Sequence, residues 1–315
     1  MATLSNVDVG VDISKQHLDA HFHQTGKAIR IQNSSTGLTK LTSLLSQYEV
    51  GQIVCESTGG YERLMCKTLG ELNYKVWCVQ PIRIKAFIVS EGIKAKTDKI
   101  DAKMIALFAS QKQCAYEPIQ RSENNEKLRN LVTLKASMTT SAAELKTQLQ
   151  QIIDSDCIQI LVKNLHFLEK QIEKLSKQIN ALITNDQAMH DKAQIITSIP
   201  GIGDGTAAMT LAMLPELGTI NNKSAAALVG VAPYIKQSGG YKGQAKISGG
   251  RAPLRGILYM AALTAIKYNQ KLMSFYQRLL AAGKVFKVAI VAVMRKLVIY
   301  MNTLVRKGEL WNTAI

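Results

Sequence analysis

Residues 7–12 read VDVGVD, a run in which every second residue is a valine. An apolar period of two is typical of a β-strand, so we expect a strand that ends at Asp12. Two more strand-like runs follow at residues 17–23 and 28–32, with residues 26–27 as a turn between them. The start of the chain therefore predicts three strands joined as a meander.

Helix-like and strand-like segments then alternate as far as residue 110. We expect helices at residues 35–48, 61–72, 82–90 and 101–110, and strands at residues 52–57 and 75–80. The order β-β-β-α-β-α-β-α is typical of an α/β domain with one mixed sheet flanked by helices. It is also the order of elements in ribonuclease-H-like folds.

Residues 122–190 contain neither proline nor glycine, which favours long helices. Apolar residues recur there at alternating spacings of four and three, at Leu161, Leu165, Leu168, Ile172, Leu175, Ile179 and Leu182. This heptad pattern predicts two long helices that form an antiparallel hairpin, a dimerising coiled coil, or both. The alternative is a seam inside the core that has no role in assembly.

Residues 195–217 follow the order short helix, glycine turn, second helix. The turn contains Gly201 and Gly203, and such a turn presents backbone N–H groups to a phosphate without reading bases. We expect a helix-hairpin-helix-like contact with nucleic acid, and an ordinary helical hairpin is the alternative. The expected domains are residues 1–120, a helical coiled-coil linker over residues 121–190, and a basic, mainly helical domain over residues 191–315.

The charge is distributed unevenly along the chain. The 315 residues carry a net charge of +16, yet residues 223–315 alone contain fifteen Lys and Arg and one acid, Glu309. A near-neutral part joined to a strongly basic part predicts a polyanionic partner, which is nucleic acid rather than an anionic membrane. The alternative is a basic surface that is merely solvated.

Four acidic residues follow or accompany the predicted strands. Asp12 ends the first strand, Glu56 ends the fourth, and Asp98 and Asp101 are spaced to share one helix face. If the first and fourth strands are neighbours, Asp12 and Glu56 project close together. Clustered carboxylates repel one another unless cations neutralise them, so such a site implies a divalent metal ion. Taken singly, each acid is also explained as a turn or capping residue.

A second candidate site is the glycine-rich stretch around Ser238. A serine beside glycines is accessible, and neighbouring cations bind phosphate oxygens and stabilise a phosphoryl transition state. The surrounding cations are Lys236, Lys242, Lys246, Arg251 and Arg255. Ser248 and Tyr241 share this loop and remain alternative nucleophiles. A loop that contacts phosphate without chemistry is the other alternative, and no nearby histidine supports a Ser–His hydrolase.

Other classes of protein are disfavoured. The N-terminus lacks a signal-peptide pattern, and the most apolar stretch, residues 288–305, is interrupted by Arg295 and Lys296. We therefore expect a soluble cytoplasmic protein with no membrane partner. The five cysteines form no CxxC pair, and the histidines give only His21 and His23 as neighbours, so a transition-metal site is not expected.

Six motifs together resemble one family across nearly the whole chain, the insertion-sequence transposases related to the Piv invertases. Some members are described as bridge-RNA-guided recombinases. The motifs are GVDISK at residues 10–15, ESTGGYE at 56–62, KTDKIDAK at 96–103, PGIGDGTAAMTLAML at 200–214, ALVGVAPYIKQSGGYKG at 227–243 and KISGGRAPLRGILYMAAL at 246–263. Residues 249–251 read GGR where the family often has Gly-Asn, a departure that affects no catalytic position.

The resemblance implies a RuvC-like N-terminal domain that holds Mg²⁺, or Mn²⁺ in its place, through Asp12, Glu56, Asp98 and Asp101. It also implies that Ser238, rather than Ser248, is the nucleophile of a C-terminal serine recombinase domain. A homo-oligomer, dimer or tetramer, would combine the acids of one subunit with the serine of another. A structured guide RNA would pair with target and donor DNA.

The expected function is thus a DNA transposase that cuts and rejoins DNA through a phosphoserine intermediate. One alternative is a metal-dependent, structure-specific nuclease of RuvC-like type that forms no covalent intermediate. Another is a nucleic-acid-binding scaffold without catalysis. Protein–DNA adducts and metal-dependent cleavage distinguish the three.

Overall fold

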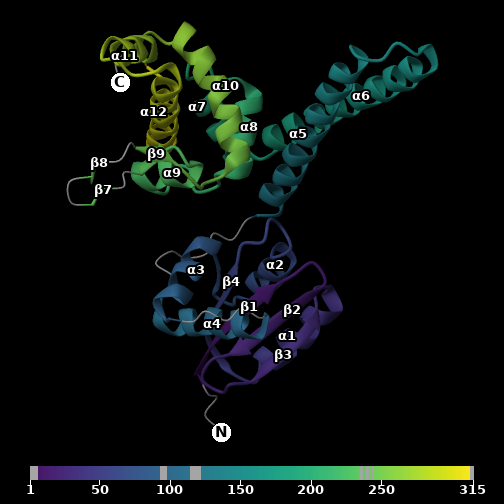
Figure 1. Ribbon diagram of the computed structural model, residues 1–315, viewed down its shortest axis with the longest axis vertical. Helices are drawn as coiled ribbons and strands as arrows, with labels where there is room; N and C mark the ends of the chain where they lie inside the picture. The colour runs from purple at the N-terminus through teal and green to yellow at the C-terminus, as the bar shows by residue number, and fades with distance from the viewer. Residues whose placement is uncertain are drawn as a thin grey trace. The chain divides into compact units, whose positions relative to one another are not determined.

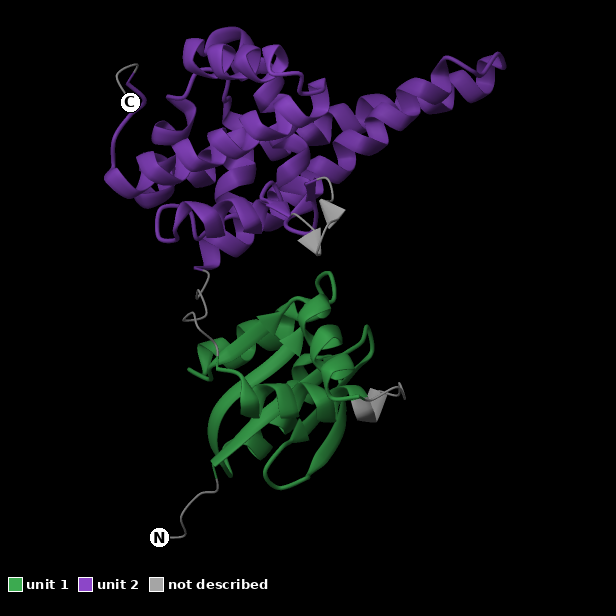
Figure 2. Ribbon diagram, turned by 60° about the vertical axis from the view of Figure 1, so that its left-hand side comes forward, with its two compact units in different colours: residues 1–120 green, residues 121–315 purple. Residues whose placement is uncertain are grey.

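A computed structural model covers the chain and divides it into two compact units, residues 1–120 and 121–315 (Figure 2). The structure describes residues 6–92, 98–113, 122–234, 237–238, 241–242 and 245–312, without the side chains of 98–100, 237–238 and 241–242. The segments expected as a helical linker and as a basic domain both lie in the second unit.

The first unit is built on one mixed five-stranded sheet in the order β3-β2-β1-β4-β5 (Figure 1). Strand β1 pairs antiparallel with β2 and parallel with β4, and β5 pairs parallel with β4. The strands are β1 Asn6–Ile13, β2 His17–Phe22, β3 Ala28–Gln32, β4 Glu49–Glu56 and β5 Val76–Val79. The predicted meander and the two later strands are confirmed.

Helices cover both faces of this sheet, which gives the unit two cores. One core joins alternate residues of β1 and β4, such as Val9 and Ile53, to apolar residues of α1 and α2. The other joins Val54 to α3 and α4. The helices are α1 Ser35–Leu45, α2 Arg63–Glu71, α3 Pro81–Ser90 and α4 Asp98–Gln111. An α/β domain with one mixed sheet is therefore confirmed.

The second unit begins with an antiparallel pair of long helices, α5 Glu123–Leu149 and α6 Ser155–Asn185. Lys146 near the end of α5 pairs with Glu169 of α6 at 2.8 Å, so these two positions lie beside each other. Leu175 and Ile179 near the base are buried, whereas Ile160 is 60% and Phe167 is 59% exposed. The far ends of both helices project away from the rest of the unit (Figure 2). The predicted hairpin is confirmed, and its role in assembly stays a prediction.

The remaining helices of the second unit pack around one large core. They are α7 Gln187–Thr197, α8 Asp204–Met213, α9 Asn222–Val229, α10 Ala252–Tyr268, α11 Gln270–Ala281 and α12 Phe286–Lys307. Helix α12 contributes Ile290, Val293 and Leu297 to that core. Of the helices in the described part of the chain, α12 alone is long and apolar enough to span a membrane, and half of its most apolar stretch is buried inside the protein.

A buried asparagine ties α12 to the loop before α9. Asn302 is fully buried, accepts a hydrogen bond from the N–H of Gly218 at 2.8 Å and donates to the carbonyl of Ile220 at 2.9 Å. It also donates to the side chain of Asn222 at 2.8 Å. A buried amide with every group paired holds this loop in one position.

Between α9 and α10 the chain forms two short antiparallel ribbons. Strand β6 Pro233–Tyr234 pairs with β9 Lys246–Ile247, and β7 Gln237–Ser238 pairs with β8 Tyr241–Lys242. Gly230 and Gly250 both have a positive φ and lie close together at the base of the ribbons. A Cβ on Gly230 would collide with the backbone of Gly249, and a Cβ on Gly250 would collide with the backbone of Gly230. The glycine-rich stretch is therefore a hairpin anchored on the end of α9.

Candidate functional site

Asp12 and Glu56 lie side by side at the carboxyl ends of β1 and β4. These parallel strands pair in register as far as Val11 and Cys55, and each acid is the next residue. Val11 and Cys55 belong to the core between the sheet and helices α1 and α2. Asp12 and Glu56, the next residues, therefore face the other side of the sheet, as Val54 does. Residues in register on adjacent strands share a face, so the two carboxylates emerge as neighbours.

Helix α4 packs on the same face of the sheet and runs antiparallel to β1 and β4. Its middle crosses β1 at Gly10, where an added Cβ would collide with the backbone between Ala102 and Ala106. Its end lies beside Gln52 of β4, whose amide donates to the carbonyl of Ala109 at 2.5 Å and that of Lys112 at 2.7 Å. The first turn of α4 therefore lies toward the carboxyl ends of the strands.

This direction brings the other two predicted acids to the same edge. Asp12 lies two residues beyond Gly10, which is about 7 Å along the strand. Measured along α4 toward its first turn, Asp101 lies about 4 Å and Asp98 about 9 Å from the point where the helix crosses Gly10. Along this direction, Asp12 and Glu56 therefore lie between the backbone positions of Asp101 and Asp98.

The side chains of Asp12, Glu56 and Asp101 are half-buried, and each makes a further interaction in the protein. The side chain of Asp98 lies outside the described residues. Among the side chains that the structure describes, no group of three or more His, Cys, Asp or Glu is close enough to hold a metal ion. The donor set at this edge, carboxylate oxygens alone, nevertheless suits Mg²⁺ or Mn²⁺ and not a thiophilic metal.

A fifth acid lies on this face and was not expected from the sequence. Asp19 of β2 stands directly opposite Asp12 in the antiparallel ladder. Arg30 of β3 engages both oxygens of its carboxylate, at 2.7 and 2.8 Å. A bidentate guanidinium leaves this carboxylate neutralised. Only the strand register, which the sequence does not state, places Asp19 beside Asp12.

Glu62 is a second residue that sequence reasoning missed, although it belongs to the quoted ESTGGYE motif. One oxygen of its carboxylate accepts hydrogen bonds from the N–H of Thr58, the hydroxyl of Thr58 and the N–H of Gly60, at 2.8–3.1 Å. Burial raises the pKa of Glu62, but hydrogen bonds from its own N–H, from Thr58 and from Gly60 outweigh burial, so the pKa lies below its usual value. The ionised carboxylate therefore holds the turn that follows Glu56.

Three cysteines, Cys55, Cys66 and Cys78, lie close together where β4 and β5 pair. The sulfurs of Cys55 and Cys66 are 3.9 Å apart, and Cys78 is paired with Cys55 across the strands. Hydrogen bonds with Cys66 and Cys78, and then burial, raise the pKa of Cys55. The hydrogen bond with Cys55 lowers the pKa of Cys66, but Cys78 and burial outweigh it and raise that pKa to about 12. Both thiols stay protonated at neutral pH.

The backbone of Ser238 lies in β7, opposite Tyr241 of β8, at the end of the ribbon. Its side chain and that of Lys242 lie outside the described residues, as does all of Lys236. Lys246 and Ser248 are exposed near the base of the hairpin. The backbone of Ser238 thus belongs to the two-stranded ribbon formed by β7 and β8.

The two arginines expected to contact nucleic acid make contacts within the second unit. Arg251 forms a bidentate ion pair with Glu216, at 2.5 and 2.6 Å. Arg255 donates to the carbonyl of Gly249 at 2.5 Å. Both contacts brace the base of the hairpin, a role that only the fold could reveal because Glu216 is distant in sequence. Their contact with nucleic acid stays a prediction.

The glycine turn between α7 and α8 has one packed and one open glycine. Gly201 has a φ of +98°, and a Cβ there would collide with Ala265 of α10. Gly203 is exposed and caps α8, whose first turn carries Asp204. An acid in that turn lowers its attraction for a phosphate. The phosphate contact expected at Gly201 and Gly203 stays a prediction, and Asp204 in the first turn of α8 disfavours it.

Two family models match the chain. Residues 9–158, which begin in β1 and include all four acids, match a model described as a transposase, of the DEDD type of IS110 elements. Residues 193–277, which include the hairpin with Ser238, match the transposase IS116/IS110/IS902 family. Together the two stretches span most of both units.

Curated relatives agree with these matches. Pilin gene-inverting proteins of Moraxella lacunata and Moraxella bovis are each 26% identical over 97% of this chain and 98% of their own length. An uncharacterized protein of the insertion element IS110 of Streptomyces coelicolor is 28% identical over 49% of this chain and 37% of its own length. The similarity to the Moraxella proteins therefore runs from end to end.

Proposed function

We propose that this chain is a DNA-recombining enzyme, because it is similar to IS110 transposases and to pilin gene-inverting proteins. From that premise we propose that it cuts and rejoins DNA through a covalent link to Ser238, assisted by a divalent metal ion held by Asp12, Glu56, Asp98 and Asp101. DNA is then its substrate, and the basic second unit is the part that binds most of it.

The four acids have one common task in this proposal. Mg²⁺ bound by their oxygens would stabilise the attacking and leaving oxygens at the phosphorus. Asp12 and Glu56 would hold it from the strand ends, and Asp98 and Asp101 from the first turn of α4. Glu62 keeps the turn after Glu56 in place, so it acts as a positioning residue.

Ser238 has the second task. Its Oγ attacks a DNA phosphorus, the new Oγ–P bond forms, and the bond from phosphorus to one deoxyribose oxygen breaks. The hydroxyl proton leaves to water and the departing oxygen takes up a proton. Attack by a strand-end hydroxyl on the phosphoserine then rejoins DNA and regenerates the serine. The number of phosphoester bonds is constant, so no nucleotide hydrolysis is needed.

The observation that supports this function most is the direction of α4. Gly10 and Gln52 hold the helix antiparallel to β1 and β4, so its first turn lies at the edge where Asp12 and Glu56 end. If α4 ran the other way, Asp98 and Asp101 would lie at the opposite edge of the sheet. Four acids distributed by chance along the chain have no reason to meet at one edge.

The test is to trap covalent adducts on nicked DNA and to identify the linked residue by mass spectrometry after nuclease digestion. We expect a nucleotide on Ser238, with Mg²⁺ required. Ser238→Ala should abolish the adduct and keep DNA binding, whereas the matched control Ser248→Ala should keep both. A nucleotide on Ser248 or Tyr241 would overturn the assignment of the nucleophile.

The acids are tested by charge removal at constant shape. Asp12→Asn and Glu56→Gln should each abolish strand exchange and leave DNA binding intact. Asp8→Asn is the matched control, because Asp8 lies on β1 and is engaged by Gln24 at 3.0 Å. Metal-dependent cleavage without any adduct would favour the nuclease that activates water, and no cleavage at all would favour a binding scaffold.

A structured guide RNA and a homo-oligomer are further parts of the proposal. The fifteen cations of residues 223–315 support binding of nucleic acid, but they do not choose between RNA and DNA. Purification of the full chain from its host, followed by separate RNase and DNase treatment, tests for a bound RNA. Recovery of strand exchange on mixing Asp12→Asn with Ser238→Ala would support a site shared between subunits.

A further inference from the structure

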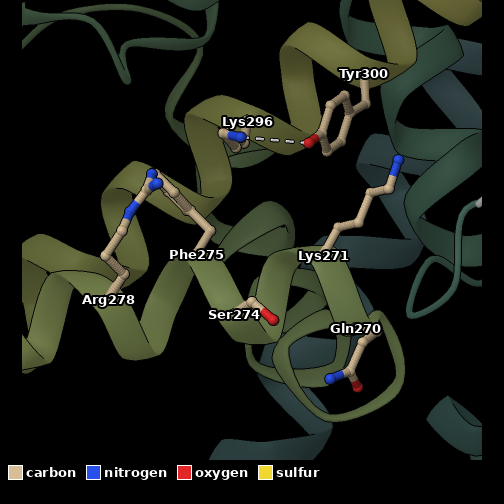
Figure 3. Close-up of a pocket in the computed structure, with 7 residues that line it drawn as sticks. All are labelled: Gln270, Lys271, Ser274, Phe275, Arg278, Lys296 and Tyr300. Carbon is tan, nitrogen blue, oxygen red and sulfur yellow. Dashed lines mark hydrogen bonds between the residues drawn. The ribbon is translucent and has the colours of Figure 1, made fainter. Parts of the chain in front are cut away.

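A cavity of about 520 Å³ opens between α11 and α12, in the second unit and apart from the hairpin of Ser238. Three cations line it, Lys271 and Arg278 from α11 and Lys296 from α12 (Figure 3). Phe275 and Tyr300 form its aromatic walls, and the hydroxyl of Ser274 is exposed at its edge. Among the residues that the structure describes, none that lines the cavity is acidic.

Aromatic rings lie beside all three of these cations, and the ammonium of Lys271 is 6.0 Å from the ring centre of Trp311. The ammonium of Lys296 lies 4.6 Å from the ring centre of Phe275 and 5.6 Å from that of Tyr300, whose hydroxyl it reaches at 3.4 Å. The guanidinium of Arg278 lies 5.4 Å from the ring centre of Phe275. Such contacts favour these positions of the cations, and an aromatic ring carries no net charge that would neutralise them.

The chain segment that forms the cavity contains no acidic residue to balance these cations. Residues 252–308 contain ten Lys and Arg and neither Asp nor Glu. Like charges gathered around one cavity repel one another, and an anion that enters relieves this repulsion. The cavity therefore favours an anionic ligand, and its volume lies in the range of sites for small molecules and single nucleotides.

We propose that this cavity binds one nucleotide unit of a single-stranded nucleic acid, with its phosphate between Lys271, Arg278 and Lys296 and its base against Tyr300, because Lys296 and Arg278 already lie over the ring of Phe275. Sites for single strands combine cations that track the backbone with aromatic faces on which bases stack. A duplex keeps its bases stacked inside and cannot place one in such a cavity. The proposal extends the DNA binding proposed above to a second place on the same unit, and it does not depend on the covalent chemistry.

The test uses the full chain and fluorescent oligothymidylate or oligouridylate of about eight nucleotides. The variant replaces all three cavity cations by glutamine, as Lys271→Gln, Arg278→Gln and Lys296→Gln. The matched control removes the same charge from exposed positions of α6, as Lys163→Gln, Lys170→Gln and Lys174→Gln. We expect the cavity variant to bind about tenfold or more weakly at low salt, with a salt slope smaller by about two. The control should bind as the unmodified chain does.

Two further measurements make the result decisive. Lys271→Arg, Arg278→Lys and Lys296→Arg together keep the charge and should keep the affinity, and thermal melting should show that every variant is folded. A cavity variant that is folded and binds both oligonucleotides as tightly as the α6 control overturns the proposal. A preference for oligouridylate over oligothymidylate would identify RNA as the ligand, and the reverse would identify DNA.

The outcome is separable from that of the recombinase proposal. Asp12→Asn and Ser238→Ala should lose strand exchange and bind these short oligonucleotides as the unmodified chain does. If no adduct is ever formed, the cavity is still tested by the binding measurement. If the cavity variant binds normally, the covalent chemistry of Ser238 remains testable on nicked DNA.

Discussion

Glu62 shows how one carboxylate can position another. It accepts three hydrogen bonds from the turn that leads away from Glu56, and its lowered pKa means that it is ionised in the native protein. The sequence places Glu62 in a motif with glycines, but it does not show which groups the side chain would reach. The turn brings Thr58 and Gly60 to it.

We expect Glu62→Gln to destabilise the first unit at neutral pH by about 1 kcal/mol, because a neutral amide accepts these hydrogen bonds less strongly. An acid whose pKa is lower in the folded than in the unfolded protein stabilises the folded state fully at pH values above its unfolded pKa, which is about 4.3 for glutamate. This stabilisation is lost as the pH falls through the pKa of the folded protein. The difference between wild type and variant should therefore shrink below that pH.

Urea unfolding followed by Trp77 fluorescence in a Trp311→Phe background measures this effect, since these are the two tryptophans of the chain. Glu71→Gln is the control, because Glu71 is exposed and lies 3.8 Å from Lys67 in a surface pair. Equal stability of Glu62→Gln and wild type at pH 7 would contradict the positioning role.

At the scale of elements, the packing of α4 on β1 decides where the helical acids lie. Gly10 is the residue at which the two backbones approach, and no side chain fits between them. Gln52 holds the other end of the helix through two carbonyl groups. A glycine in a strand often marks such a close approach of another backbone.

We expect Gly10→Ala to cost more than about 2 kcal/mol, because a methyl group must displace α4 from the sheet. Strand exchange should fall as well, since Asp98 and Asp101 move with the helix. Gly70→Ala on α2 is the matched control, because nothing lies within 4 Å of an added Cβ there. Urea unfolding followed by Trp77 fluorescence measures this loss of stability. A Gly10→Ala variant as stable as wild type would show that the interface between α4 and β1 accommodates a methyl group.

The helical hairpin carries a second prediction at this scale. Ile160 and Phe167 are one heptad apart on the exposed part of α6, so they do not hold the hairpin itself together. We expect Ile160→Lys with Phe167→Lys to leave the fold intact and to reduce self-association. Sedimentation velocity compares this variant with the control Lys163→Gln and Lys170→Gln. An unchanged sedimentation coefficient would place the subunit contact elsewhere.

At the scale of the whole molecule, the two units differ most in charge. Residues 223–315 hold fifteen of the cations and one acid, and all of them belong to the second unit. Each phosphate neutralised releases counterions, so affinity for DNA depends steeply on salt concentration. A near-neutral first unit has little of this affinity.

We expect residues 121–315 to bind duplex DNA with nearly the salt slope of the full chain, and residues 1–120 to bind far more weakly. Each fragment is a compact unit with a core of its own. Fluorescence anisotropy over a series of salt concentrations measures both slopes. Tight, salt-sensitive binding by residues 1–120 would contradict this division of labour.

Much of this protein follows from local sequence pattern. The valines of VDVGVD, the spacing of apolar residues and the absence of proline and glycine over residues 122–190 predicted the strands and long helices that the structure contains. These signals are readable because side-chain periodicity is a property of each element alone. The four acids and Ser238 could be named for the same reason, by their motifs.

Tertiary structure decided what those residues meet. The sequence determined the elements, the charge asymmetry and the candidate acids, whereas only the fold set the direction of α4, the pairing of Asp19 with Arg30 and the pairing of Arg251 with Glu216. The cavity between α11 and α12 also arises from two helices packing together. Such contacts join residues far apart in the chain, and their geometry depends on packing that no single segment encodes.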